Sequence, residues 1–409
     1  MNTTATASPW KQPAQVWAVA FACVVAFMGI GLVDPILPAI AESLQASPVE
    51  TELLFTSYLL VTGLAMLVTS WISSRIGAKA TLLIGLALIV VFALLCALSG
   101  SVDAVIGFRA GWGLGNALFI STALATIVGA ASGGSSAAIV LYEAALGLGI
   151  AIGPLLGGLL GEQSWRGPFF GVVVLMAIAF VAVLALVRES SEKRVPVPFS
   201  APFTALRRPA LAVLAVAALF YNIGFFVLLA FSPFPLGFGA MGIGLTFFGW
   251  GVALAVTSVW VAPALMRRMP RTRIILLVLP LLALDLVAAG VLVGNAAALV
   301  VCIVIGGLLL GVMNTVLTEA VMEATDLPRS VASSSYSAVR FLGGAMAPPI
   351  AALLWHAFNA TVPYLFAAAA VLIAALTVFL GRRVLAHIDD EPTDAPTVDA
   401  AAILVGDAA

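Results

Sequence analysis

The chain has 409 residues, of which 63% are hydrophobic and 9% are charged, and its formal net charge is −1. Soluble globular proteins carry about a quarter charged residues, so this composition excludes a chain surrounded by water. We therefore predict an all-α polytopic membrane protein. The three cysteines lie in apolar runs and are odd in number, which argues against a disulfide framework.

Membrane-crossing segments can be followed along the chain from its first apolar run, Val16 to Ile40. This run is too long for the apolar region of a cleaved signal peptide, so we expect it to stay as an anchor. A crossing helix needs about 20 apolar residues. Twelve segments meet this need: 16-40, 51-73, 80-99, 102-127, 134-160, 166-187, 209-231, 240-266, 273-293, 296-322, 331-355 and 361-381.

The positions of the basic residues predict the orientation. An even number of spans places both termini on one side, and cytoplasmic loops are enriched in Lys and Arg. With cytoplasmic termini, 15 of the 18 bases face the cytoplasm, two lie within spans, and only Arg166 lies outside. We expect a multi-pass protein of the cell inner (plasma) membrane, and a monomer.

One long polar interruption, residues 188-208, divides the spans into two sets of six. Both sets contain a similar eight-residue segment: Gly63 to Ser70 reads GLAMLVTS and Gly251 to Ser258 reads GVALAVTS. We predict two pseudo-symmetric six-helix halves around a central cavity, an arrangement of transporters. The halves are 1-187 and 209-384, joined by a cytoplasmic linker at 188-208, and an acidic tail at 385-409 is expected to be disordered.

Charged residues within spans are the first candidates for function, because each costs about 2.5 to 3.5 kcal/mol to insert. Six qualify: Asp34, Arg109, Glu143, Asp285, Glu319 and Arg340. Burial favours the protonated form of a carboxylate, so a carboxylate at depth is a candidate proton carrier. Glu143 lies about 6 Å from the middle of its span and is the leading candidate, although a purely structural contact between helices would also explain it.

The other in-span charges leave alternatives open. Asp34 serves either as a gate or substrate-access residue or as a side chain that reaches water at the span end. Arg109 and Arg340 are the expected partners of buried carboxylates. Glu319 lies near the inner end of its span, and Asp285 has no predicted role.

A substrate cavity is the second candidate site. Asn116, Asn222 and Asn314 lie near the middles of their spans, where they either hold helices together or line a cavity. With aromatic neighbours they would form an apolar wall with few polar groups, which suits hydrophobic ligands. The predicted lining is Asn116, Tyr221, Asn222, Phe225, Asn314, Tyr336 and Arg340.

The residues that several functional classes require do not occur in this sequence. A phosphate-binding GxxxxGK[ST] loop does not occur, and only two histidines are present. We therefore predict no cofactor, no metal site, no nucleic-acid partner and no enzymatic activity. A membrane-embedded enzyme or a non-transporting receptor remains a distant alternative.

Three motifs resemble those of the major facilitator superfamily, and specifically of its twelve-span drug:proton antiporters. The segment RAGWGLG supplies Arg109 and Gly113, and DPILP begins at Asp34. The more specific motif is a glycine-rich segment ending in GPxxGG, with Gly147, Gly149, Gly153, Pro154, Gly157 and Gly158. The resemblance covers nearly the whole chain and implies export. In the leading hypothesis, Glu143 and Asp34 bind protons and Arg109 tunes the proton path.

One departure concerns the loop between spans two and three, which in this family reads GxxxDRxGRR. Here it is SWISSRIGAK, so Ser70 and Ser74 replace the glycine and aspartate, while Arg75, Gly77 and Lys79 remain. Either the remaining bases and helix ends hold the closed states, or this protein controls them differently.

The leading hypothesis is a secondary transporter that exports hydrophobic small molecules in exchange for protons by alternating access within the lipid bilayer. Proton-coupled or facilitative uptake of a sugar or metabolite is the alternative, which would call for a more polar cavity.

Gly149, Gly153, Gly157 and Gly161 recur every fourth residue, so we expect a neighbouring helix to approach closely there. Pro154 within this ridge permits a bend.

Overall fold

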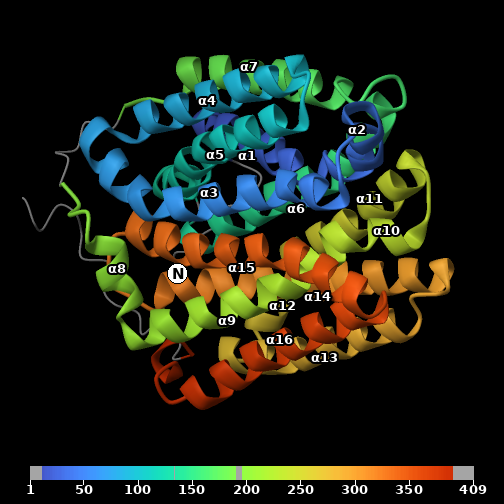
Figure 1. Cartoon of the computed structure of the whole chain (residues 1–409). Coiled ribbons are helices and arrows are strands. Elements are labelled where there is room, and N and C mark those ends of the chain that lie inside the picture. Colours follow the sequence, from blue (N-terminus) through green and yellow to red (C-terminus); the bar gives the residue numbers. More distant parts are fainter. Residues whose placement is uncertain (1–11, 133, 190–195, 390–409) are drawn as a thin grey trace, which may run out of the picture.

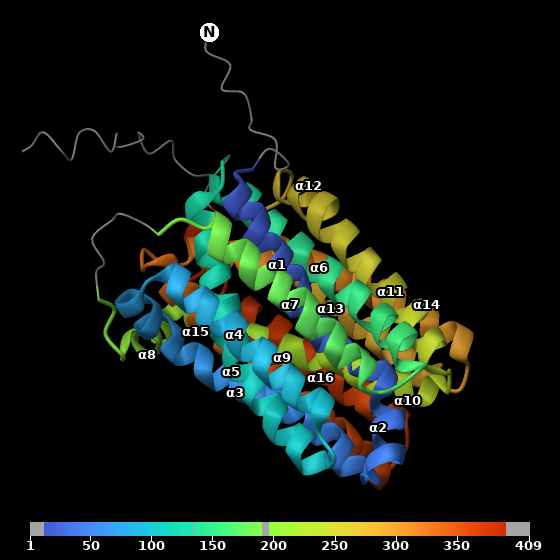
Figure 2. The same cartoon turned by 90° about the horizontal axis from the view of Figure 1, so that it is seen from above.

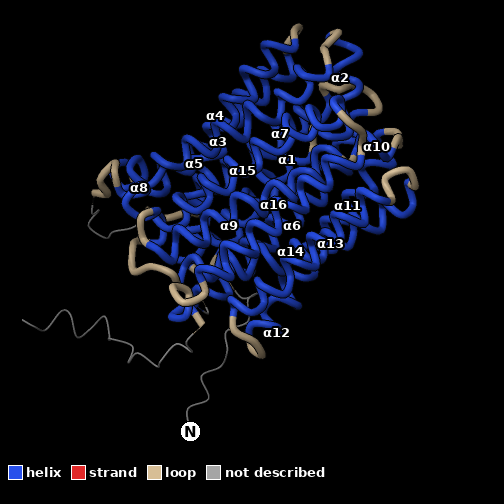
Figure 3. The backbone as a smooth tube through the Cα atoms, turned by 60° about the horizontal axis from the view of Figure 1, so that its bottom comes forward, coloured by secondary structure: helices blue, strands red, loops and turns tan. Residues whose placement is uncertain are grey.

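The computed structural model describes residues 12–132, 134–189 and 196–389. Within these residues every regular element is a helix and no strand occurs (Figure 3). In the described part of the chain, twelve helices are long and apolar enough to cross a membrane, which confirms the predicted all-α polytopic fold. Large apolar side chains on the outer face of the bundle, such as Val174, Ile178 and Val181, are more than half exposed, as expected where lipid surrounds the protein.

The first half contains six spans. Its elements are α1 (Ala14–Gly31), η1 (Asp34–Ile36), α2 (Leu37–Leu44), α3 (Pro48–Ile76), α4 (Ala78–Leu98), α5 (Val102–Ala130), α6 (Gly134–Gly161) and α7 (Gly167–Leu186). The predicted first span, 16-40, is interrupted, because α1 ends at Gly31 and a 3-10 turn follows. Pro35 explains the break, since its ring clashes with the carbonyl four residues earlier and it has no N–H to donate.

The second half follows a short helix in the linker. That linker helix is α8 (Ala201–Leu206). The second half contains α9 (Pro209–Phe226), η2 (Val227–Phe231), α10 (Pro233–Leu236), α11 (Ala240–Val256), η3 (Thr257–Val261), α12 (Ala262–Met266), α13 (Arg271–Val291), α14 (Ala296–Glu323), α15 (Arg329–Ala357) and α16 (Thr361–Gly381), and η4 (Ala386–Ile388) follows it. The seventh and eighth spans each contain a π-helical turn, η2 and η3. Pro233 and Pro263 follow these turns and remove a regular helical hydrogen bond from them.

The two halves pack against each other in equivalent ways (Figures 1 and 2). In the first half, α6 packs on α1 and on α11 of the other half, whereas α15 of the second half packs on α9 and on α3. The repeated sequence segment lies on this interface: Gly63 faces Ala338 of α15, and Gly251 faces Ala151 of α6. The repeated sequence segment therefore identifies two places where small residues let the halves approach closely.

The predicted glycine ridge is a close contact within the first half. A Cβ atom on Gly149, Gly153 or Gly157 would lie only 2.4 to 2.5 Å from a backbone oxygen of α1 or of Leu32, the residue that follows it. Those oxygens belong to Val24, Met28 and Leu32, which recur every fourth residue like the glycines themselves. The expected close approach is thus confirmed, and the neighbouring helix is α1. Pro154 lies inside α6, which continues through it, and Gly147 points elsewhere, toward Ala255 of α11.

The first residues of the acidic tail expected at 385-409 form a turn that contacts α13. The turn η4 is followed by Asp389, whose Oδ1 accepts a hydrogen bond from the backbone N–H of Thr272 at 3.0 Å. Arg271 donates from Nη1 to the Ile388 carbonyl at 2.9 Å. The cause lies at the first turn of α13, whose N–H groups need acceptors and whose preceding residue, Pro270, offers no side-chain cap. Residues 390–409 lie outside the described residues.

Candidate functional site

Glu143 forms a buried contact between the two halves. It lies on α6 with no exposed surface, and its Oε1 accepts a hydrogen bond of 2.8 Å from Thr318 Oγ1 on α14. The second oxygen, Oε2, is buried and has no hydrogen-bond partner among the described residues. A carboxylate with one satisfied and one unsatisfied oxygen at this depth has capacity for a proton.

Arg340 is the cation that faces Glu143. It lies on α15, is 9% exposed, and interacts electrostatically with Glu143 and with the buried tyrosines Tyr221 and Tyr336. The Tyr336 hydroxyl lies near both Arg340 and Thr318 but makes no hydrogen bond of good geometry. The negative and positive groups of this site therefore come from opposite halves of the protein.

Tyr221 and Asn314 complete this cluster on the side of the second half. The Tyr221 hydroxyl on α9 donates a hydrogen bond to Oδ1 of Asn314 on α14, while the Asn314 amide nitrogen has no partner among the described residues. We call Glu143, Tyr221, Asn314, Thr318, Tyr336 and Arg340 the Glu143 cluster. Every member is nearly or fully buried, so this structure is closed around it.

Sequence reasoning missed one member of the cluster, Thr318. It lies four residues after Asn314 and thus on the same face of α14, which is the signal that could have identified it. Threonine is common in apolar helices, where its hydroxyl usually bonds its own backbone. The signal is therefore weak until the partner across the interface is known.

The other residues predicted to line a cavity are not linked to the Glu143 cluster by hydrogen bonds. Phe225 packs against Phe226 and Trp250, with ring centroids at 5.0 and 5.4 Å. The amide nitrogen of Asn222 donates to the Ala218 carbonyl of its own helix at 3.0 Å. Asn116 is buried in α5, and neither of its amide atoms has a hydrogen-bond partner in the described part of the chain.

Arg109 lies in a separate site within the first half. Its Nε and Nη1 donate to the carbonyls of Leu54 and Gly29 at 3.3 and 3.2 Å, which joins α5 to α3 and α1. The guanidinium carbon lies 4.3 Å from the ring centroid of Tyr58 and 4.9 Å from that of Trp112. Arg340, and not Arg109, is the arginine that acts on Glu143. Asp34 begins η1, and its side chain lies outside the described part.

Arg109→Lys is expected to lower the free energy of unfolding by about 1 to 3 kcal/mol. A lysine keeps the charge but cannot reproduce the two directed hydrogen bonds together with the stacking of a planar guanidinium. Thermal unfolding of the purified variant in detergent measures the loss. An unchanged unfolding temperature together with lost proton coupling would instead place Arg109 in the proton path.

Two further in-span carboxylates have different surroundings. Glu319 on α14 pairs with Arg271 at 3.6 Å, so its partner is a base at the start of α13 and not one of the in-span arginines. Arg271 was counted among the loop bases, which is why sequence reasoning did not pair them. Asp285 on α13 is buried beside Gly306, and its Oδ2 has no hydrogen-bond partner among the described residues.

Two bases that flank the turn between α3 and α4 bind backbone carbonyls. Gly77 adopts a φ of 94°, a conformation that favours glycine and allows the tight turn between the two helices. Arg75 Nη1 donates to the carbonyls of Trp71 and Val197 at 3.1 and 3.2 Å. Lys79 donates to the carbonyl of Leu184, near the end of α7, at 2.8 Å. The bases retained in this loop thus tie it to the end of the sixth span and to the linker.

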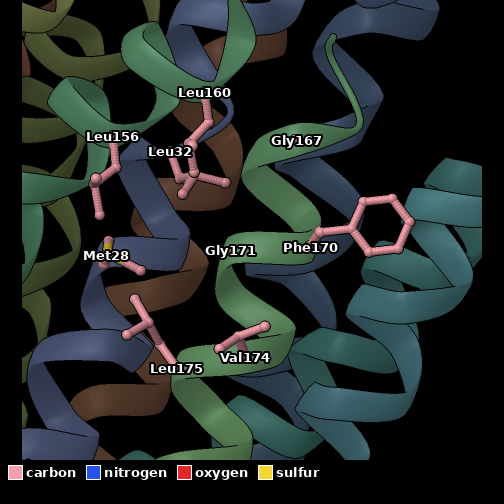
Figure 4. A pocket seen from close by; sticks show the side chains of 9 residues that line it. All are labelled: Met28, Leu32, Leu156, Leu160, Gly167, Phe170, Gly171, Val174 and Leu175. Carbon is pink, nitrogen blue, oxygen red and sulfur yellow. The ribbon is translucent and has the colours of Figure 1, made fainter. Parts of the chain in front are cut away.

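A hollow of about 410 Å³ lies away from these groups, between α1, α6 and α7 (Figure 4). Its lining is wholly apolar: Met28, Leu32, Leu156, Leu160, Gly167, Phe170, Gly171, Val174 and Leu175. Phe170 and Val174 are strongly exposed, so the hollow opens on the outer surface of the bundle. None of the predicted site residues lines it.

Comparison with known proteins agrees with this architecture. The family model described as Major Facilitator Superfamily matches residues 19–348. Multidrug efflux protein YfmO of Bacillus subtilis (strain 168) is 52% identical over 92% of this chain and 96% of its own length. The tetracenomycin C resistance and export protein of Streptomyces glaucescens is 31% identical over 45% of this chain and 35% of its own.

Solved structures share the fold at low sequence identity. The human organic anion transporter MFSD10 superposes with a TM-score of 0.75 at 18% identity, over 89% of this chain and 99% of that one. A D-xylose–proton symporter superposes with a TM-score of 0.73 at 15% identity, over 90% and 97%. These two likenesses concern the arrangement of helices.

Proposed function

The chain belongs to the Major Facilitator Superfamily, and from that premise we propose that it exports hydrophobic small molecules in exchange for protons by alternating access. The observation that carries the direction of transport is the 52% identity with a multidrug efflux protein, which extends over 92% of the chain. The apolar surroundings of the few polar groups between the halves favour hydrophobic compounds over sugars.

In this proposal Glu143 carries the proton. When it is charged, Thr318 and Arg340 attract it from the other half and hold α6 against α14 and α15. Protonation removes the charge, so the attraction to Arg340 is lost and the halves separate more readily. The same residue thereby links proton binding to the movement that alternating access requires. Arg109, which donates to carbonyls of Leu54 and Gly29, would then act on the packing of α1 and not on Glu143 directly. Asp34 stays a second candidate proton carrier in this proposal.

The substrate would bind where the halves part. Tyr221, Asn314, Tyr336 and Arg340 would then line the substrate cavity, and in this proposal Asn116, Asn222 and Phe225 would extend it into the two halves. Residues 1-187 and 209-384 would move as two bodies around the linker at 188-208. We place the protein as a monomer in the plasma membrane, with both termini and the linker on the cytoplasmic face, because basic residues concentrate on that side.

Export by the wild-type protein is tested in proteoliposomes that contain a lipophilic fluorescent dye and carry an imposed pH gradient. We expect the dye to leave the compartment on the linker side when the opposite side is acidic, and a protonophore to reduce the rate at least about tenfold. Dye movement that is unaffected by the protonophore would contradict proton exchange. Dye accumulation in the reverse direction would favour uptake.

A further inference from the structure

Asp285 is a buried carboxylate that lies outside the Glu143 cluster. It is on α13 and is 7% exposed. Its Oδ2 is buried without a hydrogen-bond partner, and no base pairs with it in the described part of the chain. Helix α13 packs on α14 and α16 and lies on the side of the second half that faces away from the first (Figure 1). Asp285 therefore forms a separate site, away from the interface where Glu143 lies.

The carboxyl group of Asp285 points into the junction of α13, α14 and the π-helical turn η2. A Cβ atom on Gly306 of α14 would lie 3.2 Å from Asp285 Oδ2 and 2.6 Å from Cδ1 of Leu228, which belongs to η2. Neither Gly306 nor the Leu228 side chain offers the carboxyl group a hydrogen-bond donor. Turns of the π type frequently occur at functional sites, where they leave the backbone able to rearrange.

The titratable groups around Asp285 are weak acids and not bases. Cys302, one turn before Gly306 on α14, interacts electrostatically with Asp285 and also with Tyr364 of α16. The Tyr364 hydroxyl shares a hydrogen bond of 2.9 Å with the hydroxyl of Ser232, the residue directly after η2. Within η2 itself no residue is titratable. These polar side chains lead from Asp285 toward the end of the bundle opposite the linker.

The remaining charged groups near α13 lie at its other end. Arg271 and Arg273 are in its first turn, His387 is in η4 beside that turn, and Glu319 pairs with Arg271. Asp285 is 14 residues after Arg271, which corresponds to about 21 Å along the helix. In helix α9, which precedes η2, the one titratable residue is Tyr221, and it bonds to Asn314 in the Glu143 cluster. No described base is therefore placed to stabilise a negative charge on Asp285.

We propose that Asp285 is a proton-binding site of the second half, additional to Glu143, which exchanges its proton on the face opposite the linker. A buried carboxylate without a counter-charge or donors is strongly disfavoured, whereas the neutral acid needs neither. The neutral acid lets Leu228 and η2 pack on α14 at Gly306. A negative charge there requires water or the hydroxyls of Ser232 and Tyr364, so η2 has to move away when the proton leaves.

Helix α9 and η2 connect this site to the Glu143 cluster, because Tyr221 lies on the same span seven residues before Leu228. Proton release at Asp285 would thus act on the span that carries Tyr221. This role in the transport cycle rests on the proposed function, whereas proton binding at Asp285 does not.

The test compares thermal unfolding of the wild type and Asp285→Asn in detergent at about pH 6 and about pH 9. Asparagine has nearly the same shape and is neutral at both values. The folded wild type holds a proton that the unfolded chain releases, so its stability falls as the pH rises. The unfolding temperature of the wild type should therefore drop relative to Asp285→Asn by about 2 to 5 °C between the two pH values.

Glu319→Gln is the matched control, because Glu319 is an in-span carboxylate of the same half that has a base as its partner. Its difference in unfolding temperature from the wild type should be the same at both pH values. A constant difference for Asp285→Asn as well overturns the proposal. Unfolding does not involve a transported compound, so failure of the proposed export would be recognised separately.

If Asp285→Asn does not fold, labelling of the wild type with dicyclohexylcarbodiimide decides the question. This hydrophobic reagent adds to protonated carboxyl groups in apolar sites, and no group leaves, so the labelled peptide gains the whole mass of the reagent. Mass spectrometry should find the labelled fraction of Asp285 at least about tenfold lower at about pH 9 than at about pH 6, with Glu319 unlabelled at both. Absence of label on Asp285, or equal labelling at both pH values, overturns the site.

Discussion

Glu143→Gln is expected to reduce pH-driven export to the level of empty vesicles while leaving the yield of folded protein unchanged. Glutamine has nearly the same shape, and its amide oxygen can still accept the hydrogen bond from Thr318. It cannot bind or release a proton, so the charge opposite Arg340 no longer changes during the cycle. We expect at least about a tenfold loss of gradient-driven dye export in proteoliposomes.

Thr318→Val is the matched control for this experiment. It removes the hydroxyl that bonds Glu143 but keeps the titratable carboxylate, so export should stay coupled to the gradient with a rate reduced by a few-fold. Dye binding in the absence of a gradient, measured by fluorescence polarisation, should be retained in both variants. If Glu143→Gln exported dye with the wild-type dependence on the gradient, another carboxylate would carry the proton.

The spans could be predicted because the hydropathy of a membrane helix is a local property of the sequence. All twelve were found, and the similar segments in the second and eighth spans indicated two equivalent halves. The breaks were harder to predict, because the interruption at Asp34 and the π-helical turns before Pro233 and Pro263 depend on how each proline is accommodated. The turn at residues 386–388 and the hydrogen bond of Asp389 depend on a tertiary contact to α13, which composition does not contain.

The candidate site was predictable as a set of residues but not as a set of pairs. Glu143, Tyr221, Asn314, Tyr336 and Arg340 were identified because polar groups in apolar helices are rare. Which of them meet depends on helix neighbours far apart in the chain, since Glu143 and Thr318 are separated by 175 residues. A single sequence contains no information on that pairing, so Arg109 and Arg340 were both expected to pair with buried carboxylates, although Arg109 binds carbonyls of α1 and α3.

Gly153→Leu is expected to lower the free energy of unfolding by about 3 kcal/mol or more and to reduce the yield of folded protein. A Cβ at this position would lie 2.5 Å from the carbonyl oxygen of Met28, which is backbone and cannot rotate away. The helices α1 and α6 would have to separate, and the contacts at Gly149 and Gly157 on the same ridge would loosen with them. Thermal unfolding and size-exclusion chromatography in detergent measure both effects.

Gly107→Leu provides the control, because nothing lies within 4 Å of a Cβ at that exposed position in α5. Leucine favours helix over glycine by roughly 0.5 to 1 kcal/mol, so this variant should be at least as stable as the wild type.

The contrast between Gly153→Leu and Glu143→Gln follows from which helices each residue contacts. Gly153 packs α6 on α1 within one half, whereas Glu143 reaches α14 of the other half. The first substitution should therefore act on the fold and the second on coupling, and equal losses of folded protein in the two variants would contradict that separation.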